Sequence, residues 1–310
     1  MAAASRTPYD PAHDLHAVLD LLLDVRLATR TDRYPTLPRL ELLLTSRLWN
    51  PADDACIWRD ADGRLIAFAG LFRRRPDAGG VGLTRVVRPT ARQIALDAAI
   101  LDWATARAGT LARERGASIA LDAEQEEHSS EWVSLLAQHG FTPAGEGDVY
   151  LACPLDGDLP DAVLPDGYVV RPLADEHELD TYTALYGFAP MNAAHRRALL
   201  HRPDYLHLVA VAPDGALAAY CECSYTRAEW ERGAPRIAWV DYIGTAEAHQ
   251  RRGLGRAVLL AGLRQMRTWG AETAMLVTMA SNTTAQSLYT AAGFHIAAAV
   301  RSYVARVSPA

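Results

Sequence analysis

The chain has 310 residues, half of them hydrophobic, and carries a formal net charge of −6. This length favours two domains of ordinary size over one, and the apolar content suffices for their cores. The acidic balance argues against a general nucleic-acid binder. No apolar run reaches the ~18 residues that a membrane-spanning helix needs, and the first residues lack the apolar core of a signal peptide.

The four cysteines show no spacing typical of a metal site, so we expect no bound metal. Cys221 and Cys223 would point to one face of an alternating strand, where small buried thiols are the simplest interpretation. Together these features predict a soluble cytoplasmic protein, monomeric or homodimeric, without nucleic-acid or membrane partners.

Two fragments of the first half of the chain recur in the second half. Residues 134–141 (SLLAQHGF) match residues 287–294 (SLYTAAGF) at an offset of 153. Residues 62–68 (DGRLIAF) match residues 214–220 (DGALAAY) at an offset of 152. Chance matches would scatter, whereas a near-constant offset is typical of tandem copies, so the chain is predicted to hold two versions of one unit.

The stretch between the two copies is rich in proline, glycine and aspartate. Residues 154–160 (PLDGDLP) and 165–167 (PDG) carry this composition, which is typical of a linker. We accordingly predict an N-terminal domain over 1–155 and a C-terminal domain over 156–310.

The second copy mixes strands and helices. In chain order the sequence predicts a strand over 168–171, helices over 176–187 and 193–202, a hairpin of strands 206–212 and 216–225, a strand over 236–245, a helix over 256–269, a strand over 271–280 and a helix over 285–292. Asp214 and Gly215 supply the hairpin turn. The expected fold class is α/β with a mixed α+β sheet, in which antiparallel strands are joined by a crossover helix.

Residues 250–257 (QRRGLGRA) join the strand 236–245 to the helix 256–269. Gly253 and Gly255 permit φ > 0 and a close approach of the backbone to a ligand. The following helix directs the positive end of its dipole at an anion, and three arginines add charge-assisted contacts. The segment therefore predicts a phosphate-binding loop. It is neither the nicotinamide fingerprint, because G-x-G-x-x-G is absent, nor a Walker loop, because the chain has no lysine.

The last predicted helix has clear start and stop signals. Asn282 can cap its N-terminus, Gly293 takes the C′ position, and Phe294 follows. Tyr289 lies seven residues after Asn282, about two turns at ~3.6 residues per turn, so the two side chains share one face of the helix.

The loop 250–257 and the segment 282–294 resemble, in this order, the acetyl-CoA loop and the closing motif of the GNAT acyltransferase family, whose loop pattern is Gln/Arg-x-x-Gly-x-Gly/Ala. The resemblance covers about half of the chain, from residue 168 to the end. It implies two tandem GNAT-like domains, an acetyl-CoA co-substrate and N-acetyltransferase activity. The positions that it implies for cofactor binding are Ile243, Gly244, Thr245, Gln250, Arg251, Arg252, Gly253, Leu254, Gly255, Arg256, Ala257, Asn282, Ala285 and Tyr289.

The two copies differ where the chemistry is expected. Four residues of the second copy are replaced in the first: Gly253 by Gln93, Gly255 by Ala95, Tyr289 by Leu136 and Glu222 by Gly70. Without the glycines, the first loop should approach a phosphate poorly. The N-terminal domain is thus predicted to be degenerate, keeping the fold but not the cofactor site, with a role in walling the substrate cleft or in dimerisation. A divergent loop that still binds coenzyme A is the alternative.

Acyl transfer to an amine requires a proton donor for the departing thiolate and a base for the ammonium. Tyr289 is the predicted general acid, with a packed aromatic as the alternative interpretation. Two carboxylates compete as base or as ligand of the substrate cation. Asp241 precedes Ile243 and Thr245 on the same side of a regular strand, and Glu222 lies in an apolar strand setting that would raise the pKa of its carboxyl. His207 and His249 are more distant candidates.

The sequence therefore predicts an acetyl-CoA-dependent N-acetyltransferase that acts on a primary amine of a small molecule, by direct transfer in a ternary complex. The degraded first copy and intact second copy also resemble the layout of mycothiol synthases, which acetylate an aminosugar–cysteine conjugate. A non-catalytic acyl-CoA-binding sensor or scaffold is the alternative from another class. The sequence leaves open the acceptor, the acyl-chain length, the identity of the base and the oligomeric state.

Overall fold

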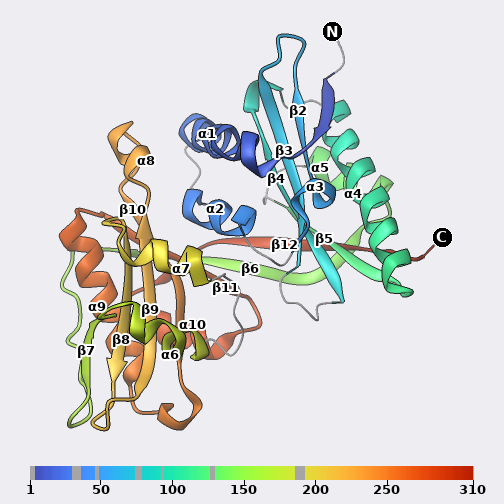
Figure 1. The fold of residues 1–310 in the computed structure, drawn as a ribbon. Helices are drawn as coiled ribbons and strands as arrows, with labels where there is room; N and C mark the ends of the chain where they lie inside the picture. Colours follow the sequence, from blue (N-terminus) through green and yellow to red (C-terminus); the bar gives the residue numbers. More distant parts are fainter. Residues whose placement is uncertain are drawn as a thin grey trace. The chain divides into compact units, whose positions relative to one another are not determined.

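The computed structural model describes residues 4–29, 36–45, 49–73, 79–91, 94–125, 130–185 and 193–309 (Figure 1). The chain forms two compact units, which we call unit 1 (Met1–Asp148 with Ala299–Ala310) and unit 2 (Val149–Ala298). The sequence predicted one domain boundary, at the linker near residue 155. The observed units differ from this prediction at the C-terminus, which belongs to unit 1 because residues 301–307 pair antiparallel with residues 119–125.

Unit 1 is built on one sheet with strand order β1-β2-β3-β4-β5-β12-β6, in which β4 and β5 are parallel. Its elements are β1 (Ser5–Pro8), α1 (Pro11–Thr29), α2 (Leu37–Thr45), α3 (Pro51–Asp54), β2 (Ala55–Arg59), β3 (Leu65–Phe72), β4 (Gly80–Val87), a 3₁₀ turn (Pro89–Ala91), α4 (Ile94–Arg115), β5 (Ile119–Gln125), α5 (Ser130–Gln138) and parts of β6 (Thr142–Pro154) and β12 (His295–Val307).

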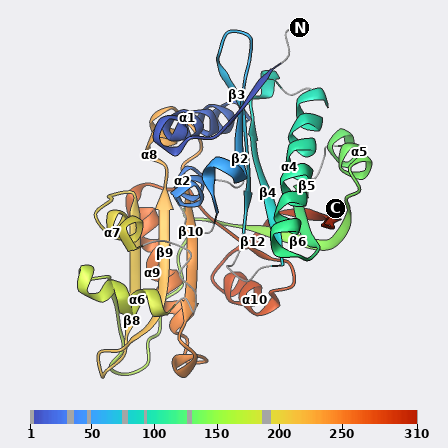
Figure 2. The same cartoon turned by 45° about the vertical axis from the view of Figure 1, so that its right-hand side comes forward.

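Helices cover both faces of the unit 1 sheet. Helices α1 and α2 pack on one face around Ile57 and Phe68, and α4 and α5 pack on the other around Ala67 and Leu71 (Figure 2). Every residue of β3 is consequently buried, which explains why its sequence, LIAFAGLF, is a continuous apolar run rather than an alternating one.

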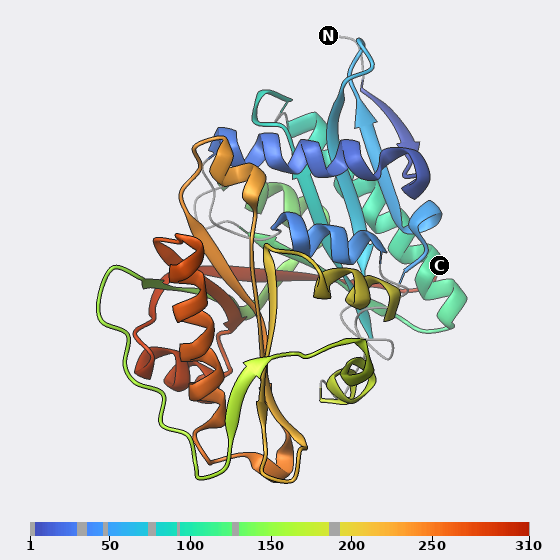
Figure 3. The same cartoon turned by 60° about the vertical axis from the view of Figure 1, so that its left-hand side comes forward.

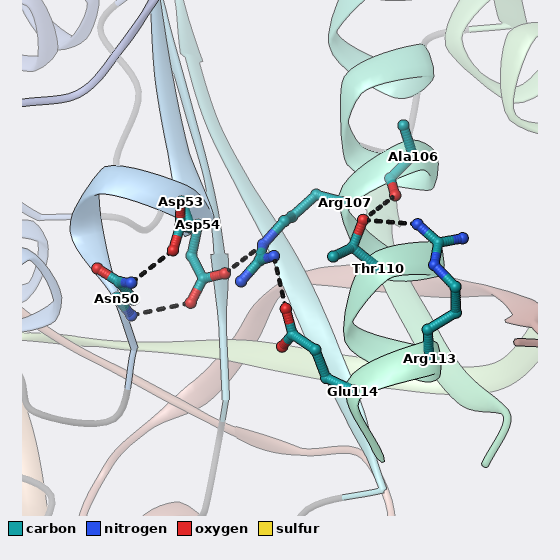
Figure 4. A network of polar contacts seen from close by, with 8 residues as sticks. All are labelled: Asn50, Asp53, Asp54, Ala106, Arg107, Thr110, Arg113 and Glu114. Carbon is teal, nitrogen blue, oxygen red and sulfur yellow. Dashed lines mark hydrogen bonds and ion pairs between the residues drawn. The ribbon is translucent and has the colours of Figure 1, made fainter. Parts of the chain in front are cut away.

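A network of polar side chains ties α3 to α4 inside unit 1 (Figure 4). The buried Asp54 accepts from Nε of Arg107 at 2.7 Å and from the backbone N–H of Asn50 at 2.9 Å, and Arg107 also contacts Glu114. A buried carboxylate is tolerated when donors replace its lost water contacts, so this network fixes α4 against the start of β2.

Unit 2 contains the predicted alternation of strands and helices, with strand order β6-β11-β10-β9-β8-β7. Its elements are β7 (Val169–Pro172), a 3₁₀ turn (Glu176–Glu178), α6 (Leu179–Ala184), α7 (Ala193–Leu200), β8 (Tyr205–Val211), β9 (Leu217–Tyr225), α8 (Arg227–Glu231), β10 (Ile237–Thr245), a 3₁₀ turn (Glu247–His249), α9 (Leu254–Trp269), β11 (Thr273–Met279) and α10 (Thr283–Ala291). The helix expected over 176–187 is wrong in its first turn, which is 3₁₀, and residues 186–187 lie outside the described residues.

Helix α9 covers one face of the unit 2 sheet, and α6 and α7 lie on the opposite side (Figure 3). The side chains of β9 alternate between these faces. Cys221 and Cys223 point together, with their Sγ atoms 3.7 Å apart, and a Cβ added at Gly262 of α9 would lie 2.8 Å from Cys223 Sγ. The predicted pair of buried thiols on one face is therefore confirmed, and Glu222 between them points to the face of α6.

Candidate active site

The parallel strands β10 and β11 separate partway along their length. They pair only where Ile237–Trp239 meets Thr273–Met275. Beyond this point β10 continues to Thr245 while it stays paired with β9, and β11 continues to Met279. One edge of residues 240–245 is thus turned toward an opening in the sheet, where an extended ligand could pair with the backbone as an added strand does.

A β-bulge lies at the start of this opening. The register of β10 against β9 shifts between Val240 and Tyr242, so that Asp241 is the extra residue and Tyr242 pairs with Glu222. The expectation that Asp241 shares a side with Ile243 and Thr245 rested on a regular strand, and the bulge interrupts that regular alternation.

Gly244 is required by its neighbour on β9. The two residues paired here are Gly244 and Tyr220, and a Cβ on Gly244 would lie 2.6 Å from Cε1 of the tyrosine ring. The ring lies over the backbone of β10, so only glycine fits at this position beside the opening.

The loop between β10 and α9 has two residues in the left-handed region. Gly253 has φ +81° as the N-cap of α9, and Arg251 has φ +63°, which is uncommon for a residue with a Cβ. Within the described part of the chain, the backbone N–H groups of residues 251–256 have no acceptor. Concave backbone with unused N–H groups at a helix N-terminus is a site for an anion.

The three arginines of the loop are not equivalent. Arg251 is exposed, and its side chain makes no hydrogen bond or ion pair with the described residues. Arg252 donates to the Tyr168 hydroxyl at 3.1 Å, which also lies 2.9 Å from Nδ1 of His249, and Arg256 donates to the carbonyl of Asp161 at 3.1 Å. Two of the three guanidiniums thus hold the loop to the segment that precedes β7, an arrangement that the sequence did not predict.

Gly255 has a packing role besides the one expected from the sequence. A Cβ at this position would meet Thr245 Oγ1 at 3.3 Å and Leu288 Cδ2 at 3.6 Å. The glycine lets the first turn of α9 approach both β10 and α10, which brings the loop next to the helix that carries Tyr289.

Helix α10 begins and ends as predicted. The Asn282 side chain accepts from the N–H of Ala285 at 3.2 Å, and Gly293 has φ +103° after the helix. Tyr289 is 6% exposed, and its hydroxyl makes no hydrogen bond within the described residues. Burial, and next the field of Cys221, raise the pKa of Tyr289 to about 12. An ordinary tyrosine pKa of about 10 would lie near that of a leaving thiol, whereas burial makes Tyr289 a weaker acid that keeps its proton at all ordinary pH values.

The environment expected for Glu222 is wrong. The residue is completely buried, but the setting is polar rather than apolar. Its carboxylate accepts from the hydroxyls of Tyr182 and Tyr205, each at 2.7 Å, and lies 3.1 Å from Nδ1 of His207. Tyr205 and His207 lie two residues apart on β8, and His207 pairs directly with Glu222. The hairpin spacing in the sequence was sufficient to predict these two neighbours. Tyr182 comes from α6, and no local pattern connects it to β9.

The comparisons with known proteins agree with this geometry. A family model described as "Acetyltransferase (GNAT) family" matches residues 172–294, which span the divergent strands, the loop and α10. Residues 172–294 therefore form a GNAT acetyltransferase domain. GNAT acetyltransferases use acetyl-CoA as the acyl donor.

None of the described helices is both long and apolar enough to cross a membrane.

Three curated relatives match this chain over between 48% and 77% of their own length. The mycothiol acetyltransferase of Pseudarthrobacter chlorophenolicus is 29% identical over 264 residues, which cover 81% of this chain and 77% of that protein. The enzyme of the same name from Salinispora arenicola is 29% identical over 250 residues, covering 76% of each chain. That of Nocardia farcinica is 35% identical over 150 residues, covering 44% of this chain and 48% of that protein.

Solved structures show the same tandem fold. A tandem GNAT protein from the clavulanic acid biosynthesis pathway has a TM-score of 0.70 at 19% identity, and the match covers 99% of this chain and 100% of that one. A GNAT acetyltransferase from Sphaerobacter thermophilus has a TM-score of 0.65 at 20% identity, covering 99% and 96%.

Unit 1 repeats the strand divergence of this GNAT site but fills it with side chains. Strand β4 pairs with β5 only at Gly80–Gly82, and its register against β3 has no bulge. The Arg85 guanidinium lies 3.8 Å from the ring centroid of Trp132 and 2.9 Å from Asp97 Oδ1. Nε1 of Trp132 donates to the carbonyl of Glu124 on β5 at 3.1 Å. Side chains of β4, α4 and α5 thus join the two strands where they diverge. Gln93 lies outside the described residues.

Proposed function

We propose that this GNAT acetyltransferase transfers the acetyl group of acetyl-CoA to a primary amine of a small molecule, by direct attack in a ternary complex. The observation that carries the proposal is the divergence of β10 from β11 beside a loop whose N–H groups are unused. We place catalysis in the C-terminal domain, 156–310, and regard the N-terminal domain, 1–155, as a degenerate copy.

The residues of unit 2 divide the binding of acetyl-CoA between two regions. The backbone of Ile243, Gly244 and Thr245 is suited to pair with the extended pantetheine arm. The loop from Gln250 to Ala257 is suited to the pyrophosphate, with its N–H groups and the positive end of the α9 dipole as the main contacts. Asn282 and Ala285 begin α10, which packs beside this loop through Leu288.

The chemistry needs a base and an acid on either side of the reacting carbon. A carboxylate, Glu222 or Asp241, takes one proton from the ammonium, and the free amine then forms a bond to the thioester carbon. The carbon–sulfur bond breaks, and Tyr289 gives its proton to the thiolate. The new amide nitrogen loses its second proton, which restores Tyr289 through solvent. Holding both reactants in the opening supplies much of the acceleration.

The relatives suggest the class of amine. Three proteins similar to this chain are named mycothiol acetyltransferases, which supports an aminosugar–cysteine conjugate as the acceptor.

Glu222 and Tyr289 lie on opposite sides of β9 and its neighbours, and the opening between β10 and β11 is where groups from both faces can approach one substrate.

The test is turnover with a panel of amines. The purified protein is incubated with acetyl-CoA and each amine, and coenzyme A and the amide are quantified by mass spectrometry. A thiol-reactive dye is unsuitable for cysteine-containing acceptors, because the acceptor itself reacts. We expect stoichiometric amide and coenzyme A with an aminosugar–cysteine conjugate. Binding of acetyl-CoA without turnover of any amine would favour a non-catalytic sensor.

A further inference from the structure

The carboxylate of Glu222 is enclosed by side chains from two other elements. Tyr182 of α6 donates to Oε1 and Tyr205 of β8 donates to Oε2, each at 2.7 Å. His207 of β8 lies with Nδ1 3.1 Å from Oε1 and 3.3 Å from the Tyr182 hydroxyl. Glu222 is 0% exposed and His207 is 4% exposed, so these contacts are shielded from bulk water.

The donors favour one protonation state of Glu222. Burial disfavours a charged carboxylate, whereas hydrogen bonds donated to both of its oxygens favour it. Two tyrosine hydroxyls and an imidazole N–H are better partners for the ionised form than for the acid, because a carboxylate accepts on both oxygens. The cage therefore keeps Glu222 in the form that can accept a proton.

Burying His207 in strand β8 carries an energetic cost that packing alone does not explain. Its Nε2 is buried and has no hydrogen-bond partner in the described part of the chain. An apolar residue on β8 would fill this space without an unsatisfied nitrogen. The contact that repays the cost is the one between Nδ1 and Glu222, which assigns the ring proton to Nδ1.

The cage is located where the sheet opens. Glu222 pairs across the sheet with Tyr242, the first residue after the bulge of β10, and β10 has left β11 from Val240 onward. Asp241 occupies the bulge itself, and Tyr220 and Ser224 are the residues of β9 on either side of the Cys221–Cys223 segment. Among the described residues of the predicted site, none is more completely buried than Glu222, whose carboxylate is held by three side chains.

We propose that Glu222 is the general base of the transfer, and that Tyr182, Tyr205 and His207 are positioning residues that hold its carboxylate ionised and fixed on the α6 face of the sheet. This rests on the proposed function and refines it, because it chooses between the two carboxylates and adds three residues. The proton of the ammonium passes to Glu222, directly or through water, and leaves to solvent after the amide is released.

The test compares pH–rate profiles of variants. Tyr205→Phe and Tyr182→Phe each remove one donor, so the acid limb of the kcat/KM profile should move to higher pH, with a deficit of about tenfold at low pH that shrinks as pH rises. Glu222→Gln should lose about 10²-fold or more. Tyr225→Phe is the matched control, because this buried ring contacts Trp230 and Trp269 rather than Glu222, and its profile should match that of the wild type.

Two further comparisons separate positioning from packing. His207→Asn keeps a donor near Nδ1 and should recover most of the kcat/KM that His207→Leu loses. In the Glu222→Gln background, Tyr205→Phe should cause little further loss, because its effect acts through the carboxylate. An equal loss in both backgrounds, or unchanged acid limbs in the three positioning variants, would overturn the assignment.

The same assays distinguish failure of the proposed function from failure of the base assignment. If the wild type turns over an amine and Glu222→Gln retains its kcat/KM, the assignment of the base fails while the proposed function stands. If the wild type forms no amide with any amine, the proposed function fails, and this assignment falls with it.

Discussion

Arg85 of unit 1 occupies the position that Ile243 holds in unit 2. Arg85 pairs with Ala69 across β3 and β4, and Ile243 pairs with Cys221 across β9 and β10, where Ala69 and Cys221 are related by the 152-residue repeat offset. In unit 2 the backbone edge of Ile243 that does not pair with β9 faces the opening between β10 and β11. In unit 1 the position carries a guanidinium fixed between Trp132 and Asp97. The same backbone divergence is thus open in one copy and filled in the other.

This relationship predicts a single acetyl-CoA site per chain. The cation–π contact and the ion pair of Arg85 would have to break before a pantetheine arm could enter between β4 and β5. Isothermal titration calorimetry should give a stoichiometry of one. Arg85→Ile is not expected to change the affinity of that site. Two equivalent sites in the wild type would contradict the prediction.

Gly253→Ala should weaken acetyl-CoA binding by distorting the loop. Gly253 has φ +81°, and a Cβ there would lie 3.9 Å from the Val163 carbonyl oxygen, which is an ordinary contact, so the cost of a Cβ is conformational, about 1 kcal/mol. Gly233→Ala is the matched control, since Gly233 has φ +79° and open space around it, but lies away from the loop. Thermal unfolding should show similar destabilisation of the two variants, while titration calorimetry should show lower affinity in Gly253→Ala alone.

Gly255→Gln should weaken binding more strongly than Gly253→Ala. A side chain here meets Thr245 and Leu288 and displaces the first turn of α9 from β10. Gly255→Ala should be intermediate, because its Cβ contact of 3.3 Å needs only a small shift. Wild-type affinity in Gly255→Gln would show that the loop is not the phosphate site.

Tyr289→Phe should lower kcat by ~10²–10⁴-fold and leave the Kd for acetyl-CoA nearly unchanged. The pKa of Tyr289 is raised to about 12, so the phenol stays protonated at every pH of a normal assay. Deprotonation of Tyr289 should therefore not produce an alkaline limb below about pH 11 in the wild-type pH–rate profile. A variant with wild-type kcat would show that Tyr289 is only a packed aromatic.

The raised pKa of Tyr289 also predicts a pH dependence of stability. Between the ordinary tyrosine pKa of about 10 and the folded value of about 12, the unfolded chain loses the proton first. The free energy of unfolding should fall as pH rises through this window, and its value below pH 10 should not depend on this ionisation. Denaturant unfolding should show a smaller fall for Tyr289→Phe than for the wild type.

Asp241→Asn separates the second carboxylate from the base. Asp241 is the bulge residue beside the opening and is suited to bind the substrate cation. The variant should raise KM for the amine without moving the acid limb of the kcat profile. A deficit confined to low pH, and recovered as free amine accumulates, would instead identify Asp241 as the base.

Features that depend on neighbouring residues could be predicted from the sequence alone. The Asn282 cap, the αL conformation of Gly253 and Gly293, the hairpin around Asp214 and the alternation of Cys221 with Cys223 all follow from local backbone geometry and strand periodicity. The repeat offset likewise indicated two copies, because tandem units keep their spacing.

The surroundings of each reacting group depend on elements that are distant in the sequence, so they became visible only in the folded chain. The polar cage of Glu222 needs Tyr182 from a helix 40 residues away in sequence, and the sequence around Glu222 alone indicated an apolar setting. The bulge at Asp241 is a mismatch between two strands, and the filling of unit 1 depends on Trp132 lying against β5. Burial, register and contacts between distant elements set charge and access, and local sequence carries no record of them.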